Sequence, residues 1–147
     1  MKVLIADDDP VCRRLLSAAL LKHGCDVRSA VDGREAETLA RADRPDVVIT
    51  DILMPQMNGY DLCRRLKSDA ALHRVPVVLL TSLSDPRDVI SAIQCRADGF
   101  LTKPFDRTVL IEFIENVVRW AASGRGARGD GRIELHYGGE SFLLEPD

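Results

Sequence analysis

The chain has 147 residues, of which 46% are hydrophobic and 29% charged, and its formal net charge is -3 at pH 7. This is ordinary composition for one globular domain with its own core, and it excludes a disordered chain. The small net charge gives no bulk electrostatic reason to bind nucleic acid or a membrane surface. No apolar run approaches the roughly 20 residues of a membrane-spanning helix, and Asp7 comes too early for a signal peptide. We therefore expect a cytoplasmic protein.

The four cysteines are scattered along the chain and none is spaced as C-x-x-C. This distribution argues against a zinc site and against a disulfide framework. We expect reduced cysteines that pack in the interior, namely Cys12, Cys25, Cys63 and Cys95.

The first predicted strand, residues 2–6, ends in three acidic residues followed by Pro10. Proline favours the first position of a helix and aspartate the position before it, so Asp9 is the expected N-cap. The helix should run to about residue 23, because its apolar stripe (Cys12, Leu15, Leu16, Ala19 and Leu20) ends before Gly24. Asp7 and Asp8 are left without such a structural role.

The third predicted strand carries Asp51 to its carboxyl end. A weaker strand over residues 25–30 and a polar helix over 34–42 come before it. Residues 47–50 are an apolar, β-branched run, which is typical of a strand buried on both faces. Pro55, Asn58 and Gly59 then interrupt regular structure, and a helix is expected over residues 60–67.

Two further strands end in polar residues. Residues 75–80 form an apolar strand that ends at Thr81, and a helix should open at Pro86 and run to about residue 96. Residues 100–102 form a short strand that ends at Lys103 and Pro104. Asp106 can then cap a last helix, which Gly124 ends.

Five strands alternating with five helices predict an α/β fold, a doubly wound (βα)5 parallel sheet with helices on both faces. Ligands of such sheets bind beyond the carboxyl ends of the strands. Five side chains should therefore meet at one edge: Asp7, Asp8, Asp51, Thr81 and Lys103. Each has an ordinary explanation when taken alone, as a helix cap, a strand-end residue or a surface charge.

Taken together, these groups are suited to phosphoryl transfer. Clustered carboxylates repel one another, and Mg²⁺, which prefers oxygen ligands, relieves that repulsion. Asp51 can act as the nucleophile, while the metal ion, Lys103 and the Thr81 hydroxyl neutralise the phosphoryl oxygens. A cis bond before Pro104 would direct Lys103 back over the sheet.

These motifs resemble the receiver domain of two-component response regulators over residues 2–122. The matching features are Asp7 and Asp8 after the first strand, Asp51 with Met54, Pro55 and Gly59, Thr81, and the run Lys103, Pro104 and Phe105. The resemblance implies the flavodoxin-like strand order 2-1-3-4-5, phosphorylation of Asp51, and Mg²⁺ held by Asp7, Asp8, Asp51 and the carbonyl of Leu53. Thr81, Phe100, Lys103 and Pro104 would couple phosphorylation to conformation.

The resemblance also implies partners and an output surface. A histidine kinase or phosphotransfer protein would supply the phosphoryl group. The face formed by the fourth helix, fifth strand and fifth helix would carry the signal and possible homodimerisation. Independently of the resemblance, we expect no direct nucleic-acid binding, because the chain has no room for a DNA-binding helical unit. Phosphorylation should shift Phe100, which replaces the family's usual tyrosine, toward a buried position. Arg96 stands where the family often has a small residue.

Leu53 and Leu83 occupy positions that in receivers border the path of the hydrolytic water. Neither side chain can hydrogen-bond that water, so we expect slow loss of the phosphoryl group.

Two alternatives belong to other functional classes. Asp7, Asp9 and Val11 also fit the nucleophile signature of haloacid-dehalogenase-like Mg²⁺-dependent phosphatases, with Asp7 as nucleophile and Asp9 as acid/base. That interpretation leaves Asp51 and the residues after it unexplained. A degenerate receiver that acts only as a binding module is disfavoured by the intact set of acids, Thr81 and Lys103.

The domain organisation follows from the composition of the C-terminal part. Residues 1–123 form the expected receiver domain, and the Gly- and Arg-rich residues 124–132 a flexible linker. Residues 133–147 alternate around Gly138 and Gly139 like a β-hairpin. An isolated hairpin is marginally stable, so it should either dock on the receiver or begin a following domain.

Overall fold

The computed structural model describes residues 1–82, 86–103, 105–122, 133–137 and 140–144, the last two ranges for their backbone alone. The predictions for Leu83, for Pro104 and for the linker 124–132 concern residues outside these ranges. Within the described ranges, no helix combines the length and apolar character needed to cross a lipid bilayer.

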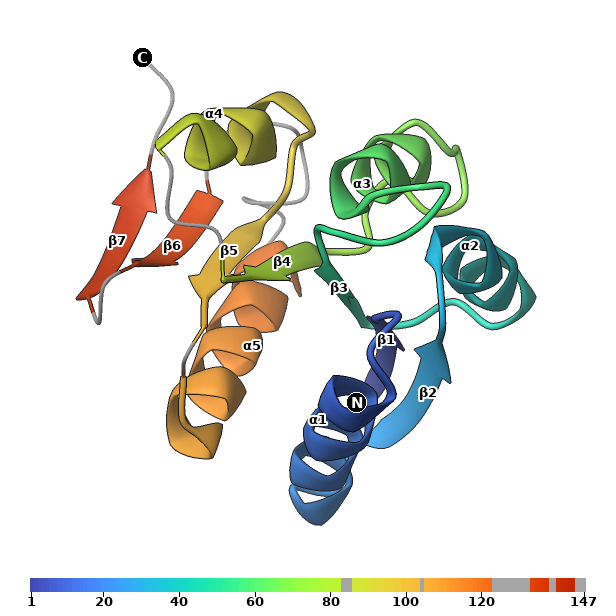
Figure 1. Ribbon diagram of the computed structural model, residues 1–147, viewed down its shortest axis with the longest axis horizontal. Coiled ribbons are helices and arrows are strands. Elements are labelled where there is room, and N and C mark those ends of the chain that lie inside the picture. The colour runs from blue at the N-terminus through green and yellow to red at the C-terminus, as the bar shows by residue number, and fades with distance from the viewer. Residues whose placement is uncertain (83–85, 104, 123–132, 138–139, 145–147) are drawn as a thin grey trace.

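The described strands form one sheet in the order β2-β1-β3-β4-β5-β6-β7. The first five pair in parallel, which confirms the predicted fold and strand order. Their bounds are β1 Lys2–Ala6, β2 Asp26–Ala30, β3 Val47–Asp51, β4 Val77–Thr81 and β5 Gly99–Thr102. Beyond β5 lie β6 Ile133–Tyr137 and β7 Glu140–Leu144 (Figure 1).

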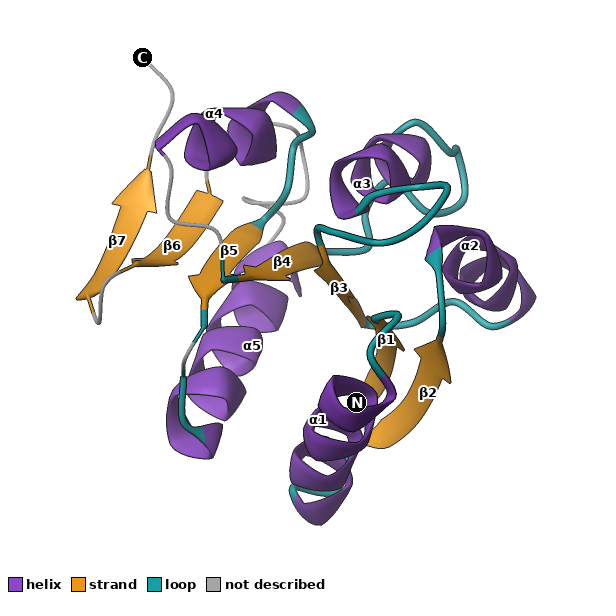
Figure 2. Cartoon of the chain, in the orientation of Figure 1, coloured by secondary structure: helices purple, strands orange, loops and turns teal. Residues whose placement is uncertain are grey.

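Helices cover both faces of the parallel strands, as alternation of strands and helices requires. The bounds are α1 Pro10–Lys22, α2 Gly33–Ala42, α3 Gly59–Lys67, α4 Pro86–Gln94 and α5 Arg107–Ala122. Helices α1 and α5 lie on one face, and α2, α3 and α4 lie on the other (Figure 2).

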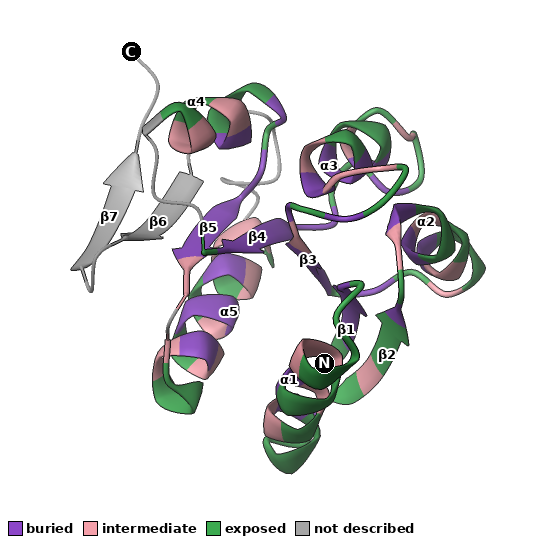
Figure 3. Ribbon diagram, viewed as in Figure 1, coloured by how far each residue is buried: buried purple, intermediate pink, exposed green. Residues whose placement is uncertain are grey.

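The core consists of two clusters separated by the sheet, and successive strand residues contribute to opposite clusters. In β3, Val47 and Ile49 pack with the residues of α1 and α5, whereas Val48 packs with those of α2 and α3. Figure 3 shows this central part of the sheet as buried. Because β3 is covered on both faces, its apolar run shows no alternation.

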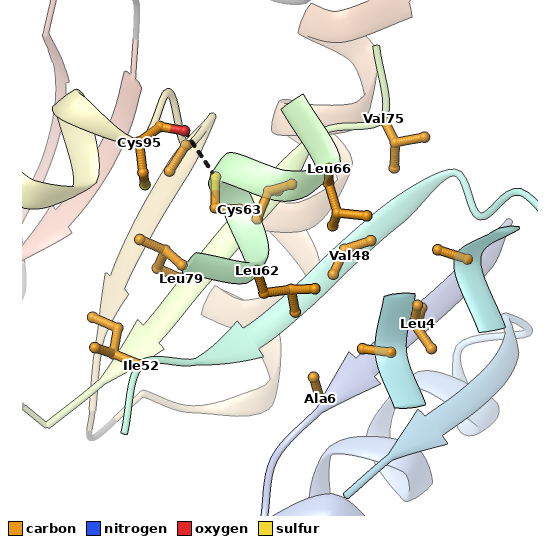
Figure 4. Close-up of a cluster of buried hydrophobic side chains, with 14 of the residues drawn as sticks. Leu4, Ala6, Val48, Ile52, Leu62, Cys63, Leu66, Val75, Leu79 and Cys95 are labelled. Carbon is orange, nitrogen blue, oxygen red and sulfur yellow. Dashed lines mark hydrogen bonds between the residues drawn. The ribbon is translucent and has the colours of Figure 1, made fainter. Parts of the chain in front are cut away.

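The cluster beneath α2, α3 and α4 includes two of the cysteines (Figure 4). The Cys63 thiol of α3 donates to the backbone carbonyl of Cys95, which follows α4, at 3.2 Å. Cys25, Cys63 and Cys95 are buried as predicted, whereas Cys12 is only partly buried, and all four thiols are free.

Helix α1 begins and ends as its sequence predicts. The Asp9 carboxylate accepts a hydrogen bond from Val11 N at 2.9 Å. Gly24, with φ +91°, closes the C-terminus as Cys25 N donates to Leu20 O at 3.0 Å. Leu15 belongs to the predicted apolar stripe but does not face the core, because its exposed fraction is 67%. The buried face is narrower than expected, and Leu15 lies about 100° around the helix from buried Leu16.

Helix α4 ends with the backbone arrangement that usually carries glycine. Ala97 N donates to Ala92 O and Arg96 N donates to Ile93 O, both at 3.1 Å, and Arg96 has φ +65°. This is a Schellman motif whose left-handed residue is Arg96. The left-handed conformation at this position disfavours residues with a large side chain, which explains the small residue expected here from the resemblance. Arg96 adopts this unfavourable conformation.

The C-terminal strands extend the sheet instead of standing apart from it. β6 pairs in parallel with β5, and β7 pairs antiparallel with β6, from Ile133 opposite Leu144 to Tyr137 opposite Glu140. The edge of β5 that faces away from β4 is consequently occupied by β6.

Candidate functional site

Three carboxylates meet at the carboxyl end of the sheet. β1 and β3 are parallel neighbours with Ala6 opposite Thr50, so the residues that follow in each strand, Asp7 and Asp51, lie side by side. One oxygen of each of Asp7, Asp8 and Asp51 lies within 4.8 Å of the other two. The topology thus brings together the three acids that the sequence placed at one edge.

Asp7 is the most deeply buried of the three, with 1% of its surface exposed. Its Oδ1 accepts a hydrogen bond from Asp9 N at 2.9 Å. Burial raises the pKa of the Asp7 carboxyl, the Asp9 N–H opposes this rise, and the nearby Asp51 charge adds to it. The protein therefore holds an acid in a place where its negative charge is unfavourable unless a cation is near.

Asp51 is half-buried at the end of β3. Its Oδ1 accepts from Ile52 N at 2.8 Å. Burial raises the pKa of the Asp51 carboxyl, and the Lys103 ammonium is the largest influence that lowers it. The Asp8 charge adds to the rise in the Asp51 pKa, because a neighbouring carboxylate disfavours the ionised form of Asp51.

Lys103 faces both buried acids. Its Nζ lies 3.9 Å from Oδ2 of Asp7 and 3.9 Å from Oδ2 of Asp51. These distances are too long for a hydrogen bond but short enough for Coulomb attraction. Its backbone N–H donates to Thr81 O at 2.7 Å, which ties the end of β5 to the end of β4.

Thr81 and Phe100 lie on neighbouring strands. Leu80 pairs with Asp51, so Thr81 extends one residue beyond the phosphoacceptor candidate, and it is 1% exposed. Phe100 pairs with Leu79 and is 0% exposed in the cluster that faces α2, α3 and α4. The buried position expected of Phe100 after phosphorylation is thus the one that it has in this structure.

Gly59 shapes the loop after Asp51. A Cβ atom at this position would lie 2.3 Å from the Asp51 carbonyl oxygen and 2.9 Å from Ile52 Cα. Gly59 N donates to Ile52 O at 2.8 Å, so α3 begins directly against the end of β3. The glycine predicted as a turn residue is therefore required for close backbone approach. Leu53, in the same loop, is 63% exposed.

Arg13 belongs to the site although the sequence analysis missed it. Its Nη1 donates to the backbone carbonyl of Asp7 at 2.7 Å, which fixes the end of β1 against α1. One signal was available in the sequence: a cation near a helix N-terminus is unfavourable to the helix dipole. An arginine in the first turns of a helix, such as Arg13, therefore suggests that its guanidinium binds a nearby oxygen.

The donor set fits a magnesium ion. All three side chains offer carboxylate oxygens, which Mg²⁺ prefers. Burial and mutual repulsion also raise the pKa values of Asp7 and Asp51, so a divalent cation would relieve an existing electrostatic cost.

Comparison with known proteins agrees with this geometry. The family model for the response regulator receiver domain matches residues 3–115. The transcriptional regulatory protein CseB of Streptomyces coelicolor is 36% identical over 138 residues, which are 93% of this chain and 58% of CseB. The response regulator PleD of Caulobacter vibrioides is 37% identical over 119 residues, 81% of this chain and 26% of PleD. The chain thus spans about half or less of these relatives' length.

Solved structures match the same part of the chain. Chemotaxis protein CheY4 of Vibrio cholerae has a TM-score of 0.76 at 33% identity, covering 79% of this chain and 97% of its own. The receiver domain of a signal transduction histidine kinase from Syntrophus aciditrophicus has a TM-score of 0.76 at 42% identity, covering 80% and 89%. These findings give no support to the haloacid-dehalogenase-like alternative. The chain belongs to the response regulator receiver domain family.

Proposed function

We propose that Asp51 accepts a phosphoryl group in a Mg²⁺-dependent reaction and that the domain thereby transmits a signal. The observation that carries this proposal is the position of Asp51 at the end of the central strand β3. There it lies between two further carboxylates, Asp7 and Asp8, and the Lys103 ammonium 3.9 Å away. Acid, cation and strand-end hydroxyl together form a complete set for holding a phosphoryl group.

Accessibility supports Asp51 as the nucleophile in preference to Asp7. Both acids accept one backbone hydrogen bond on Oδ1, but Asp7 is 1% exposed, so a phosphodonor cannot reach it without rearrangement. Asp51 keeps its Oδ2 toward Lys103, and 18% of its side chain is exposed. Because Lys103 is equally close to both acids, greater access is what favours Asp51 over Asp7.

The metal ion would be held by Asp7, Asp8 and Asp51, with the Leu53 carbonyl as a fourth protein ligand. When bound, it supplies positive charge to the phosphoryl oxygens. Lys103 supplies a second positive charge near Asp51, and Arg13 holds the backbone of Asp7 in place.

The expected donor is a phosphohistidine on a histidine kinase or a phosphotransfer protein. An Asp51 oxygen attacks phosphorus, the phosphorus–nitrogen bond breaks, and its electron pair remains on the imidazole nitrogen. The product is an aspartyl phosphate with a charge of about -1.5 to -2 on its phosphoryl group.

We further propose that Thr81 and Lys103 sense this product. The Thr81 hydroxyl and the Lys103 ammonium can each bind a phosphoryl oxygen, and the hydrogen bond from Lys103 N to Thr81 O links the two strand ends. Phe100 is already buried, so the change should appear mainly in the segment between Thr81 and α4. Pro104 would hold Lys103 in this arrangement.

The proposed function also includes a surface that passes on the signal. CseB is named as a transcriptional regulatory protein and PleD as a response regulator, and this chain covers only part of each. We propose that α4, β5 and α5 carry the signal to a linked domain or a partner in the cytoplasm. A homodimer that uses the β5 edge would require β6 to leave it.

The test is phosphorylation by acetyl phosphate with and without Mg²⁺, followed by intact mass. The wild type and Asp26→Ala, which removes an exposed acid at the opposite end of the sheet, should gain a phosphoryl group with Mg²⁺. Asp51→Ala should gain none. Equal labelling of the wild type and Asp51→Ala would refute the proposal.

A further inference from the structure

The outer edge of β5 carries a strand from beyond the residues that the receiver family model matches. The family match ends at residue 115, whereas β6 begins at Ile133. β6 pairs in parallel with β5, with Gly99 opposite Glu134, Phe100 opposite Leu135, and Leu101 opposite His136. The hairpin formed by β6 and β7 thus lies beyond the family match, although the 93% of the chain that aligns with CseB includes β6.

An uncovered β5 edge would be prone to pairing. Phe100 and Leu101 are both 0% exposed, so β5 is an apolar strand embedded between the two core clusters. Without a neighbour, its outward N–H and C=O groups would be an unpaired row beside this apolar interior. Such rows are the surfaces on which other extended chains add as further strands.

The hairpin is joined to the rest of the domain by a short ladder and a long connection. The ladder comprises the three register pairs of β5 and β6. Ten residues, 123–132, separate the end of α5 from the start of β6. Attachment through a connection of this length and Gly-rich composition gives the hairpin an effective concentration on the order of millimolar, so it outcompetes a free strand of equal affinity that is present at micromolar concentration.

We propose that the outer edge of β5 is a strand-docking surface and that the chain's own hairpin, Ile133–Leu144, is its cap. The surface accepts an extended segment that runs parallel to β5, and Ile133–Tyr137 is the occupant in this chain. While the hairpin is docked, the edge is closed to a strand of any other protein. This inference does not depend on phosphorylation of Asp51.

The test uses the full chain with a proline in β6. Leu135→Pro removes a backbone N–H opposite Phe100 and restricts φ, which should release the hairpin. His136→Pro, opposite Leu101, is a second break in the same ladder. Arg128→Pro, in the connection outside the hairpin, is the matched control.

Two readouts are expected to agree. Amide hydrogen exchange in residues 99–102 should be at least about tenfold faster in Leu135→Pro and His136→Pro than in the wild type and Arg128→Pro. Exchange in β1 and β3 should be unchanged, which verifies that the domain remains folded. A fluorescein-labelled peptide of residues 131–145 should bind Leu135→Pro at least about tenfold more tightly than the wild type, whose edge is occupied.

Each other outcome counts against the proposal. Equal exchange of residues 99–102 in all four proteins would mean that the hairpin does not cover β5. Failure of the peptide to bind Leu135→Pro would mean that the edge is not a docking surface. A wild type that is dimeric by light scattering and becomes monomeric as Leu135→Pro would show a second copy as the occupant and overturn the cap within one chain.

Discussion

The Lys103 ammonium nitrogen lies 3.9 Å from Oδ2 of Asp51. The two groups attract each other across this gap without a direct hydrogen bond. The same nitrogen is 3.9 Å from Oδ2 of Asp7, so Lys103 is not committed to either acid. A cation in this position can turn to a new phosphoryl oxygen at little cost, since no strong bond has to break first.

Lys103→Gln should therefore slow phosphorylation while leaving the fold intact. The neutral amide cannot neutralise the phosphoryl oxygens, and loss of one such group commonly costs about a hundredfold in rate. Lys103→Arg, which keeps the charge, should retain part of the rate. The measurement is the rate of labelling with acetyl phosphate at saturating Mg²⁺. A rate for Lys103→Gln within about twofold of the wild type would argue against a role for Lys103 in transfer.

Stability without a metal ion should depend on the charge of Asp7. Burial raises the pKa values of Asp7 and Asp51 above those of the unfolded chain, so the folded protein binds their protons more tightly. The contribution of this tighter proton binding to the stability of the fold is fully present below the unfolded pKa of about 4, and it is lost as pH rises through the raised folded pKa. Asp7→Asn should therefore increase the free energy of unfolding at pH 7 and should have a smaller effect at pH 5.

Stabilisation by Mg²⁺ tests whether Asp7 is a ligand of the metal ion. At ten times its dissociation constant the ion should stabilise the wild type at pH 7 by about 1.4 kcal/mol, and Asp7→Asn much less. Urea unfolding at pH 5 and pH 7, with and without Mg²⁺, measures both effects. An equal gain from Mg²⁺ in the wild type and Asp7→Asn would remove Asp7 from the metal site.

Arg96→Gly should stabilise the domain. Arg96 has φ +65° at the end of α4, where a residue with a side chain is disfavoured by about 1 kcal/mol or more. Glycine loses more entropy on folding, so the net gain should be below about 1 kcal/mol. Gln94→Gly, two residues earlier and within α4, should instead destabilise by about 1 kcal/mol. Urea unfolding that gave the two variants the same sign would refute this explanation of Arg96.

Leu53→Asn should shorten the lifetime of the phosphorylated state. Leu53 is 63% exposed beside Asp51 and cannot hydrogen-bond an attacking water, whereas an amide can orient one. We expect decay about tenfold faster than in the wild type after the donor is removed. The control is Leu21→Asn, which changes an exposed leucine at the C-terminus of α1, the end away from the acidic residues. If the aspartyl phosphate of Leu53→Asn decayed at the wild-type rate, Leu53 would have no influence on hydrolysis.

The elements and the site could be predicted because both depend on local patterns. The run of Val47, Val48 and Ile49 marks a strand buried on both faces, and β3 is such a strand. Once five strands are parallel, the residues after them must meet at one edge, so Asp7, Asp51 and Lys103 converge without any further information. The cap at Asp9 likewise follows from its own neighbours.

Contacts between distant segments could not be predicted in this way. Whether residues 133–144 dock depends on the unpaired edge of β5, and nothing in the hairpin's own sequence specifies that neighbour. The hydrogen bond from Arg13 to the Asp7 carbonyl and the closeness of Gly59 to the Asp51 carbonyl depend on how helices approach strand ends. The exposure of Leu15 depends on how little of α1 the sheet covers.

The most direct measurement of the central claim is the position of the phosphoryl group. The wild type is labelled with acetyl phosphate and Mg²⁺, reduced with borohydride to convert an aspartyl phosphate to homoserine, and digested for tandem mass spectrometry. The proposed role of Asp51 predicts homoserine at position 51 alone, and none when Mg²⁺ is replaced by a chelator. Homoserine at position 7, 8 or 9, or the same amount at position 51 without Mg²⁺, would contradict it.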